Sequence, residues 1–414
     1  MRELQPVRGT RDIMPEEFRQ HNYLVDQLRY FAELYGYSEI STPIFEFSDV
    51  FKRTLGDTSD IVTKEMYTFS DKGGDEITLR PEGTAGVARM LISSGLKQNL
   101  PLKYFYNGPM FRYERPQKGR FRQFHQIGVE LLGVPEVIGD IEVIALASSM
   151  LDGLGILSQC TLEINTLGNK VSRKGYRHKL INYLRDYRDQ LSEDSRRRLD
   201  RNPLRVLDSK DKGDKKIIEN APEFVESLDA ESKDFFSGVK EGLDKLSISY
   251  KLNSRLVRGL DYYCHTAFEF TTGGLGAQGT VLAGGRYDGL VEQMGGPKIA
   301  GVGWAAGIER MAMLVNHSPD RKRPIAVIPV VADLQMEALL LAKDLRSAGN
   351  VVELGYRGNM SRRLKRANKL NAIFAVLIGP DEIRRGMVTL RNLDTGNQEE
   401  VSLDTLTDHL SQFL

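Results

Sequence analysis

Cysteine is almost missing from this chain of 414 residues, which contains Cys160 and Cys264 as its two copies. These two residues lie far apart in a long chain, which argues against a disulfide framework and against a zinc site of the Cys-x-x-Cys type. We therefore expect a reducing, cytoplasmic setting and no zinc.

Long apolar runs are also missing. One of the longest, residues 325–331, is far shorter than the roughly 20 residues that a membrane helix needs, and the polar N-terminus shows no secretory signal. We expect no membrane association. Charge of one sign is not in excess either, since 57 basic and 56 acidic residues leave a net charge of +1. This balance excludes a protein that coats polyanions by bulk charge, but it leaves room for a local basic face.

Glycine, by contrast, is plentiful and unevenly spread. Of the 39 glycines, 12 fall within residues 273–307, where they alternate with strand-forming residues. Glycine among strand formers indicates backbone that lies close to a ligand or to other backbone. The string Gly274-x-Gly276-x-x-Gly279 matches a dinucleotide-binding pattern, but no helical pattern follows it, which argues against a Rossmann site.

Changes in composition divide the chain, which is long enough for two or three domains. Apolar residues at helical spacing predict a helix over residues 17–35, and one strand pattern follows over residues 38–47. Charge density rises over residues 172–247 while strand signals fade, which predicts a mainly helical insertion. The polar, proline-bracketed residues 316–324 are typical of a linker. Beyond them, strand and helix patterns alternate, which predicts a small α/β domain with a largely parallel sheet.

The densest group of arginine and aromatic residues runs from Phe111 to Gln126, around a loop that contains Pro116 and Gly119. The planar arginine fork grips phosphate at two points and neutralises charge that develops in phosphoryl or adenylyl transfer. Phe124 offers a stacking face for a base. Taken alone, such a run would usually be a solvated basic hairpin.

Three further segments favour a binding site. Residues 79–84 place a carboxylate and a hydroxyl on a turn after a strand, which suits an α-ammonium group. Residues 257–270 form a strand-like run with an arginine and paired tyrosines, for which a structural strand with buried aromatics is the alternative. Residues 301–310 indicate a glycine-rich strand that leads into a helix presenting an arginine.

Together these segments resemble the histidyl-tRNA synthetase family of class II aminoacyl-tRNA synthetases, and the resemblance covers essentially the whole chain. Residues 17–43 resemble motif 1, which builds the dimer interface in class II enzymes, residues 111–126 resemble motif 2, and residues 303–310 resemble motif 3. The specific pieces are LVRGLDYY at residues 256–263 and AGGRYD at residues 283–288, the two histidine-binding signatures of the family. The class I signatures are absent.

The resemblance implies an α+β catalytic domain with a mainly antiparallel sheet, a helical insertion and a C-terminal α/β anticodon-binding domain. The predicted boundaries are 1–171 and 248–318 for the two parts of the catalytic domain, 172–247 for the insertion and 325–414 for the anticodon-binding domain. The resemblance also implies a homodimer that binds L-histidine, ATP and tRNA(His). Magnesium would accompany ATP, and no protein side chain is assigned to a metal.

The implied reaction has two steps. Histidine and ATP give histidyl-adenylate and pyrophosphate, and the histidyl group then passes to the 3′ end of the tRNA. In the first step a carboxylate attacks the α-phosphate, and these two anions repel each other. The resemblance assigns Arg112 and Arg258 to hold them from opposite sides as the catalytic pair, with Arg258 where most class II synthetases use a metal ion.

The resemblance also assigns residues to each substrate. ATP would be bound by Arg112, Glu114, Phe124 and Arg310, with Phe124 stacked on adenine, Glu114 at its amino group and Arg310 at the γ-phosphate. Histidine would be bound at its α-amino group by Glu82, Thr84 and Gln126, and around its imidazole by Glu130, Tyr262 and Tyr263. The acceptor end of the tRNA would contact Arg115, Gln117, Lys118 and Arg120. Without the resemblance, Glu130 would be interpreted as a surface carboxylate.

RNA contacts are also expected outside the catalytic segments. We expect the insertion to contact the acceptor arm of the tRNA. In the terminal domain, Arg362, Arg366 and Lys369 fall on one predicted helical face, which suits RNA. A solvated helix face explains any single one of them nearly as well.

Two other functions stay open at this point. A histidine-binding relative serves as a regulatory subunit of ATP phosphoribosyltransferase, but such relatives typically lack the terminal domain and lose the ATP arginines. This chain has both the residues of a terminal domain after Pro324 and the arginines Arg112, Arg258 and Arg310. A general RNA-binding protein would explain the basic runs, but not the set of Glu82, Glu130 and Tyr263.

Overall fold

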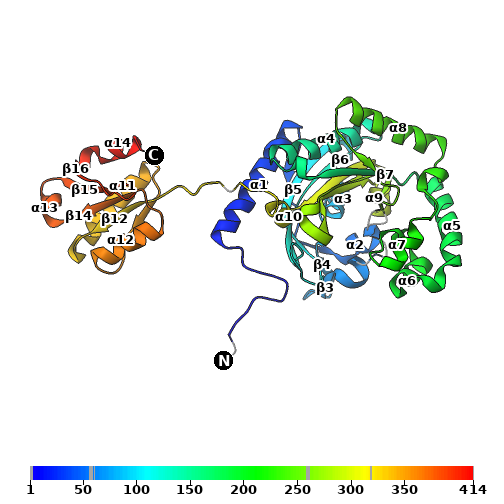
Figure 1. Cartoon of the computed structure of the whole chain (residues 1–414), viewed down its shortest axis with the longest axis horizontal. Coiled ribbons are helices and arrows are strands. Elements are labelled where there is room, and N and C mark those ends of the chain that lie inside the picture. Colours follow the sequence, from blue (N-terminus) through cyan, green and yellow to red (C-terminus); the bar gives the residue numbers. More distant parts are fainter. Residues whose placement is uncertain (1–2, 56–58, 60, 258–261, 318, 414) are drawn as a thin grey trace. The chain divides into compact units, whose positions relative to one another are not determined.

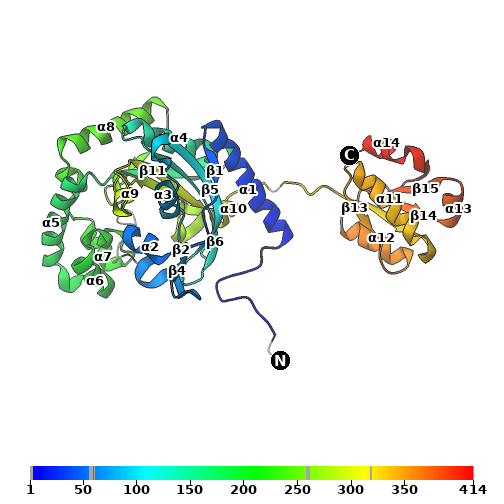
Figure 2. The ribbon, with the colours of Figure 1, turned by 180° about the vertical axis from the view of Figure 1, so that it is seen from behind.

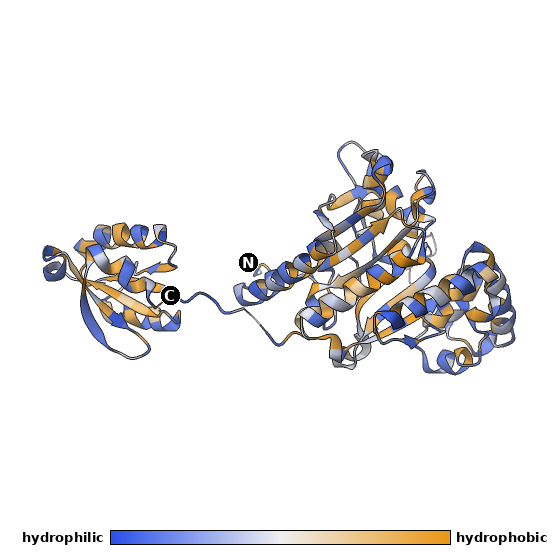
Figure 3. Ribbon diagram, turned by 90° about the horizontal axis from the view of Figure 1, so that it is seen from above, coloured by the Kyte–Doolittle hydropathy of each residue, from blue (hydrophilic) through white to orange (hydrophobic). Residues whose placement is uncertain are grey.

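The chain folds into two compact units, Met1–Pro319 (unit 1) and Asp320–Leu414 (unit 2), each with its own hydrophobic core (Figure 1). In the part of the chain that is described, no helix combines the length and the apolar character needed to cross a membrane. Figure 3 shows the stretch that connects the units mostly in blue, in agreement with the hydrophilic linker expected there. The computed structural model describes residues 3–55, 59, 61–257, 262–317 and 319–413.

The described part of unit 1 is built on an eight-stranded sheet in the order β1-β5-β6-β11-β10-β9-β7-β8. The two edge strands run parallel to their neighbours, and the strands between them pair antiparallel. This confirms the mainly antiparallel sheet that the sequence led us to expect. Its strands are β1 (Ser38–Ile40), β5 (Leu102–Phe111), β6 (Gln123–Leu132), β7 (Thr161–Thr166), β8 (Lys251–Leu252), β9 (Cys264–Thr271), β10 (Thr280–Arg286) and β11 (Gly301–Gly307).

Alternation along the strands separates the main core from the opposite face of the sheet, because successive side chains of a strand point to opposite sides. In β6, Ile127 and Val129 are buried in the core under the covering helices, whereas Phe124 and Gln126 face the other way and line a cavity. Figures 1 and 2 show these covering helices, which are α1 (Pro15–Leu34), α4 (Val137–Gly153), α8 (Ala230–Lys245) and α10 (Ile308–Ala312).

The other face of the sheet carries a second core and a small three-stranded sheet in the order β2-β4-β3. One expectation is corrected here, because the single strand pattern of residues 38–47 forms two strands in two different sheets. Pro43 lies between them and lacks an amide hydrogen, so it cannot donate to a sheet ladder and the chain changes sheets there. The elements on this side are α2 (Ser48–Leu55), α3 (Thr84–Ser93), α9 (Leu290–Gln293), β2 (Phe45–Phe47), β3 (Tyr67–Ser70) and β4 (Glu76–Leu79).

The charged segment between β7 and β8 contains helices and connecting loops but no strand in its described part. Its helices α5 (Lys170–Asp186), α6 (Glu193–Arg201), α7 (Lys212–Ile218) and α8 begin at side chains that accept hydrogen bonds from the first helical amides. These capping residues are Asn169, Ser192, Asp211 and Asp229. The segment has a core of its own. The exact boundaries expected for the insertion stay a prediction.

Unit 2 is an α/β domain with a five-stranded sheet in the order β13-β12-β14-β15-β16. Strands β12, β13 and β14 are parallel, but β15 and β16 form an antiparallel hairpin, so the sheet is mixed and less parallel than expected. A tight turn that contains Gly396, with a φ of 80°, reverses the chain between them. The elements are β12 (Ile325–Pro329), β13 (Val352–Leu354), β14 (Phe374–Ile378), β15 (Met387–Asn392), β16 (Gln398–Ser402), α11 (Gln335–Ser347), α12 (Met360–Lys369), α13 (Pro380–Arg384) and α14 (Leu406–Ser411).

Candidate active site

A cavity of about 930 Å³ opens on the face of the large sheet that carries Phe124 and Gln126. Segments that are far apart in the sequence meet in its wall, including the turn before α3, the loop between β5 and β6, and the start of α10. The residues assigned from sequence that line the cavity are Glu82, Thr84, Arg112, Glu114, Arg120, Phe124, Gln126, Tyr262, Tyr263 and Arg310.

The glycine-rich segment explains why this face of the sheet is hollow. In the antiparallel pair β10 and β11, Ala283 lies opposite Ala305, and both line the cavity with small side chains. Gly303 occupies a position where an added Cβ would lie 2.0 Å from Oε2 of Glu130 and 2.3 Å from the carbonyl oxygen of Val129. Glycine is therefore required at this position by the close approach of its neighbours.

Two half-buried guanidinium groups lie together in one part of the cavity wall. Nε of Arg112 donates to the carbonyl oxygen of Pro81 at 2.8 Å, and the Arg112 guanidinium lies 5.3 Å from the centre of the Phe124 ring. Arg310 donates to the carbonyl oxygens of Gly119 at 3.3 Å and Thr280 at 3.0 Å. Burial lowers the pKa of both arginines, yet arginine stays protonated in proteins. This part of the cavity therefore favours an anion.

Glu114 and Arg120 lie beside these arginines. The Glu114 carboxylate pairs with Nε of Arg120 and lies 3.9 Å from the guanidinium of Arg112. Arg120 thus faces the cavity, whereas Arg115, Gln117 and Lys118 are exposed on the surrounding loop. The structure does not group Arg120 with the three exposed residues that were assigned with it to the tRNA.

The part of the cavity wall next to Arg112 is organised by the start of α3. The Glu82 carboxylate accepts hydrogen bonds from the amides of Thr84 at 2.7 Å and Ala85 at 2.9 Å. Burial raises the pKa of Glu82. The Thr84 hydroxyl donates to Glu130 at 2.6 Å, so these residues form a connected polar group beside the cavity.

Glu130 lies behind the cavity wall. It is 0 % exposed, and besides Thr84 it accepts hydrogen bonds from the hydroxyls of Tyr287 at 2.5 Å and Tyr106 at 3.4 Å. It is therefore no surface carboxylate, although it is not among the residues that line the cavity. The rings of Tyr262 and Tyr263 are 4.6 Å apart. Reasoning from sequence did not assign Tyr106 or Tyr287, although Tyr287 lies within the AGGRYD signature.

The neighbouring arginine of that signature has a different environment. Arg286 is 0 % exposed and pairs with Asp140 of α4, while it also donates to the carbonyl oxygen of Val134 at 3.0 Å and to Asp288 at 3.1 Å. These contacts attach α4 to the sheet on the face away from the cavity. Arg286 thus has a structural role. Tyr287 is the residue of this signature that forms a hydrogen bond with Glu130.

The insertion supplies part of the cavity wall that sequence reasoning did not assign. Arg198, Arg205 and Lys210 line the cavity together with Asp194. The charged runs near these positions were visible in the sequence, but nothing in a linear pattern tells which side of a helical segment faces the sheet.

The assigned catalytic residue Arg258 lies outside the described residues, as do Gly259, Leu260 and Asp261 of the same signature. The pairing of Arg112 with Arg258 therefore stays a prediction, and so do the roles of the individual residues in the cavity.

A test of the buried position of Glu130 follows from its protonation. Burial raises the pKa of Glu130 to about 8, whereas a glutamate of an unfolded chain titrates near roughly 4.3. Between these values the folded state keeps a proton that the unfolded state has released, so the free energy of unfolding falls as the pH rises through this window. In Glu130→Gln, which mimics the neutral carboxyl, we expect this fall to be smaller by roughly 1 kcal/mol per pH unit. Urea unfolding of the native chain and of Glu130→Gln, measured between about pH 5 and pH 8, gives the difference. Parallel plots of the free energy of unfolding against pH would contradict the prediction.

Comparison with known proteins adds to this geometry. The family model described as histidyl-tRNA synthetase matches residues 9–311, and the model described as anticodon binding domain matches residues 324–413. The chain is 56% identical over 417 residues to the histidine–tRNA ligase of Rhodospirillum rubrum, with 100% of both chains covered. It is 53% identical to that of Gluconacetobacter diazotrophicus, with 99% of both covered. Apo histidyl-tRNA synthetase of S. aureus has a similar structure, with a TM-score of 0.82, 35% identity, and 98% of this chain and 99% of that chain covered.

Proposed function

The chain belongs to the histidyl-tRNA synthetase family, and we propose that its 930 Å³ cavity is the place where histidine and ATP react. The enzyme joins histidine to tRNA in two steps, through histidyl-adenylate and with release of pyrophosphate. The observation that carries the assignment is the convergence of Arg112, Arg310, Glu82 and Thr84 from separate segments on one cavity.

In the activation step, the part of the cavity that holds the guanidinium groups binds the triphosphate. Arg112 neutralises charge at the α-phosphate while the histidine carboxylate attacks it, and Arg258 approaches the same atoms from the other side. Arg310 binds the γ-phosphate. Phe124 stacks on adenine, and Glu114 accepts a hydrogen bond from the adenine amino group. Preorganised cations in a buried site stabilise developing charge without the reorganisation that water would need.

The part of the cavity beside Arg112 binds the amino acid. Glu82, Thr84 and Gln126 contact the α-ammonium group of histidine. Tyr262 and Tyr263 surround the imidazole. Glu130 lies behind Thr84 and influences the imidazole site indirectly, through its hydrogen bond with the Thr84 hydroxyl. A site that hydrogen-bonds both imidazole nitrogens rejects side chains without them by roughly ten-thousandfold or more.

Magnesium belongs to the ATP end of the site. Glu269, a carboxylate of β9 that lines the cavity, has the oxygen donors that Mg²⁺ prefers in combination with substrate phosphates. When bound, the ion would neutralise part of the triphosphate charge.

The tRNA is bound in two places. The exposed residues Arg115, Gln117 and Lys118 contact the acceptor end, and Arg120 acts from the cavity wall. The insertion, residues 172–247, contacts the acceptor arm with Arg198, Arg205 and Lys210 on its cavity side. Unit 2, the domain assigned to residues 325–414, binds the anticodon.

We also infer a homodimer in the cytoplasm, where tRNA is charged. Apolar side chains gather on the small sheet that follows motif 1, where Phe45, Phe47 and Phe69 are 57%, 60% and 48% exposed. Exposed apolar residues at this density favour a protein interface. The two cysteines are free thiols, as a reducing compartment requires.

The experiment that tests this function is aminoacylation of total tRNA with each of the twenty amino acids in turn. We expect charging with histidine and with none of the other nineteen. A regulatory subunit would bind histidine without charging tRNA, and an RNA-binding protein would show no dependence on ATP. Either result would contradict the proposal.

A further inference from the structure

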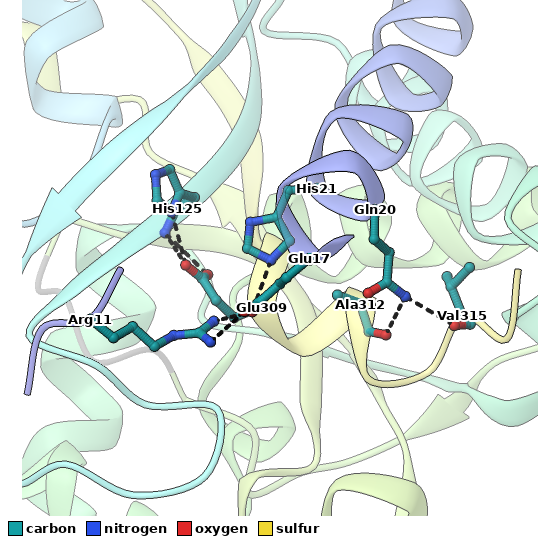
Figure 4. Close-up of polar contacts among 8 residues, drawn as sticks. All are labelled: Arg11, Glu17, Gln20, His21, His125, Glu309, Ala312 and Val315. Atoms are coloured by element: carbon teal, nitrogen blue, oxygen red, sulfur yellow. Dashed lines mark hydrogen bonds and ion pairs between the residues drawn. The ribbon is translucent and has the colours of Figure 1, made fainter. Parts of the chain in front are cut away.

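A cluster of three side chains lies at the junction of α1, β6 and α10 (Figure 4). None of the three was assigned to a substrate, although Glu309 also lines the cavity. His21 comes from α1, His125 from β6 and Glu309 from α10. Each offers one atom that could bind a metal ion, and these three atoms lie within 4.8 Å of one another. Because Phe124 and Gln126 face the cavity, the side chain of His125 between them points to the opposite side of the sheet, toward α1.

The hydrogen bonds in this cluster are unevenly distributed. Glu309 accepts a hydrogen bond from the ring of His125 at 2.9 Å, and from the His125 amide at 2.9 Å and 3.1 Å. By contrast, Nε2 of His21 has no hydrogen-bond partner. Water cannot easily serve as its partner, because His21 is only 5% exposed. The carboxylate of Glu17 lies 3.6 Å from this nitrogen. A buried polar atom without a partner destabilises the fold unless something binds it.

We propose that His21, His125 and Glu309 form a binding site for a divalent transition metal, with Zn²⁺ as its ion. Two neutral imidazoles and one carboxylate are a ligand set that zinc uses in proteins, with water in the fourth position. Ligand atoms around a tetrahedral zinc lie roughly 3.4 Å apart. Binding the ion therefore requires the His21 side chain to move toward the other two ligands, which would give its unpartnered nitrogen a bond.

The charge around the cluster suits a cation. Glu17 and Glu309 carry two negative charges, and Arg11, which is bound to Glu17 at 2.7 Å, carries one positive charge. Around His21 one negative charge is left over among these groups, while Arg310 interacts with Glu309 from the next position in the chain. The Glu17 carboxylate lies 3.6 Å from Nε2 of His21, the nitrogen that would bind the ion, so its negative charge also favours a cation there.

The metal would connect elements that are already in contact. Gln20 of α1 donates to the carbonyl oxygens of Ala312 at 3.0 Å and Val315 at 3.4 Å, at the end of α10 (Figure 4). Binding therefore needs no movement of the helices. The ion would hold α1 against the back of the strand that carries Phe124 and Gln126, and Glu309 would connect it to the cavity wall. The expectation of no zinc concerned cysteine ligands, and these three ligands come from segments that no linear motif joins.

The test uses the full chain without an affinity tag, freed of metal with a chelator and then titrated with Zn²⁺ and, separately, with Co²⁺. We expect one equivalent of Zn²⁺ to bind and to raise the temperature of thermal unfolding. Co²⁺ should give the intense visible absorption of a tetrahedral site, and Zn²⁺ should remove it. In His21→Gln, the bound equivalent and the absorption should both be lost.

The matched control is His409→Gln. His409 also pairs with a carboxylate, Glu399 at 3.0 Å, but in the described residues no third ligand group joins them. This variant should bind Zn²⁺ as the native chain does. His21→Leu checks the fold, because an apolar side chain loses no hydrogen bond at Nε2 and should fold without metal, as circular dichroism would show. Equal binding by the native chain and both His21 variants, or no stoichiometric binding by the native chain, would overturn the proposal.

Discussion

Histidine-dependent exchange of pyrophosphate into ATP is expected to fall by roughly 100- to 1,000-fold in the Arg112→Gln variant, the range found when one preorganised charge contact is removed from a buried site. The reason lies in the position of Arg112. Its guanidinium is held by the carbonyl oxygen of Pro81 at 2.8 Å and lies against Phe124, so no other side chain moves easily into its place. Glutamine keeps much of the length and the hydrogen bonding but removes the charge. The loss should appear in kcat more than in the KM for histidine, because the charge acts on the α-phosphate during attack.

Arg115→Gln is the matched control for this variant. Arg115 belongs to the same loop, but it is exposed and does not line the cavity. We expect its pyrophosphate exchange to equal that of the native enzyme, while its charging of tRNA becomes weaker and more sensitive to salt. Circular dichroism of both variants checks the fold. Near-normal exchange in Arg112→Gln, or an equal loss in both variants, would contradict the role of Arg112 in activation.

Much of this site was accessible from the sequence because its residues are tied to local patterns. Glu82 and Thr84 lie on a turn between a strand and a helix, and Arg112 and Phe124 lie on either side of the loop of one hairpin. Once the family is identified, such positions transfer directly, because the local backbone fixes where each side chain points. The same holds for unit 2, where the apolar strands β12 and β14 are buried at every position.

Other features depend on the packing of distant segments and could not be predicted. Glu130 lies behind Thr84 because Gly303, on the neighbouring strand, has no side chain to keep it away. Arg120 turns into the cavity because Glu114 holds it there. The position of Arg198 in the cavity wall depends on how a whole helical segment packs against the sheet. In each case the partner is distant in the sequence or across a loop, and only the folded chain brings the two together.

The proposed metal site of His21, His125 and Glu309 could not be predicted from the sequence for the same reason. Each residue has an ordinary role in the sequence, one in a helix, one in a strand and one next to the arginine of motif 3. The three side chains meet on one side of the sheet. This follows from the alternation of side-chain directions along β6 and from the contact between α1 and α10. A ligand set spread over three elements leaves no linear motif.

A fragment that ends at Pro319 is expected to keep histidine-dependent pyrophosphate exchange but to lose most of its charging of tRNA. All residues that line the cavity belong to unit 1, and the core of that unit includes no residue of unit 2. Loss of a binding surface that contributes only about 3 kcal/mol weakens tRNA binding by roughly 100-fold.

The basic face of α12 identifies the part of unit 2 that should matter. Arg362, Arg366 and Lys369 are exposed along this helix, whereas Arg363 is 8% exposed and donates to the carbonyl oxygen of Pro329. In the full chain, Arg362→Gln combined with Lys369→Gln should therefore weaken charging less than the truncation does and leave exchange unchanged. Exchange and charging measured side by side distinguish the two functions. A fragment that charges tRNA as well as the full chain would show that unit 2 does not bind the anticodon, whereas loss of exchange in the fragment would show that the two units do not fold independently.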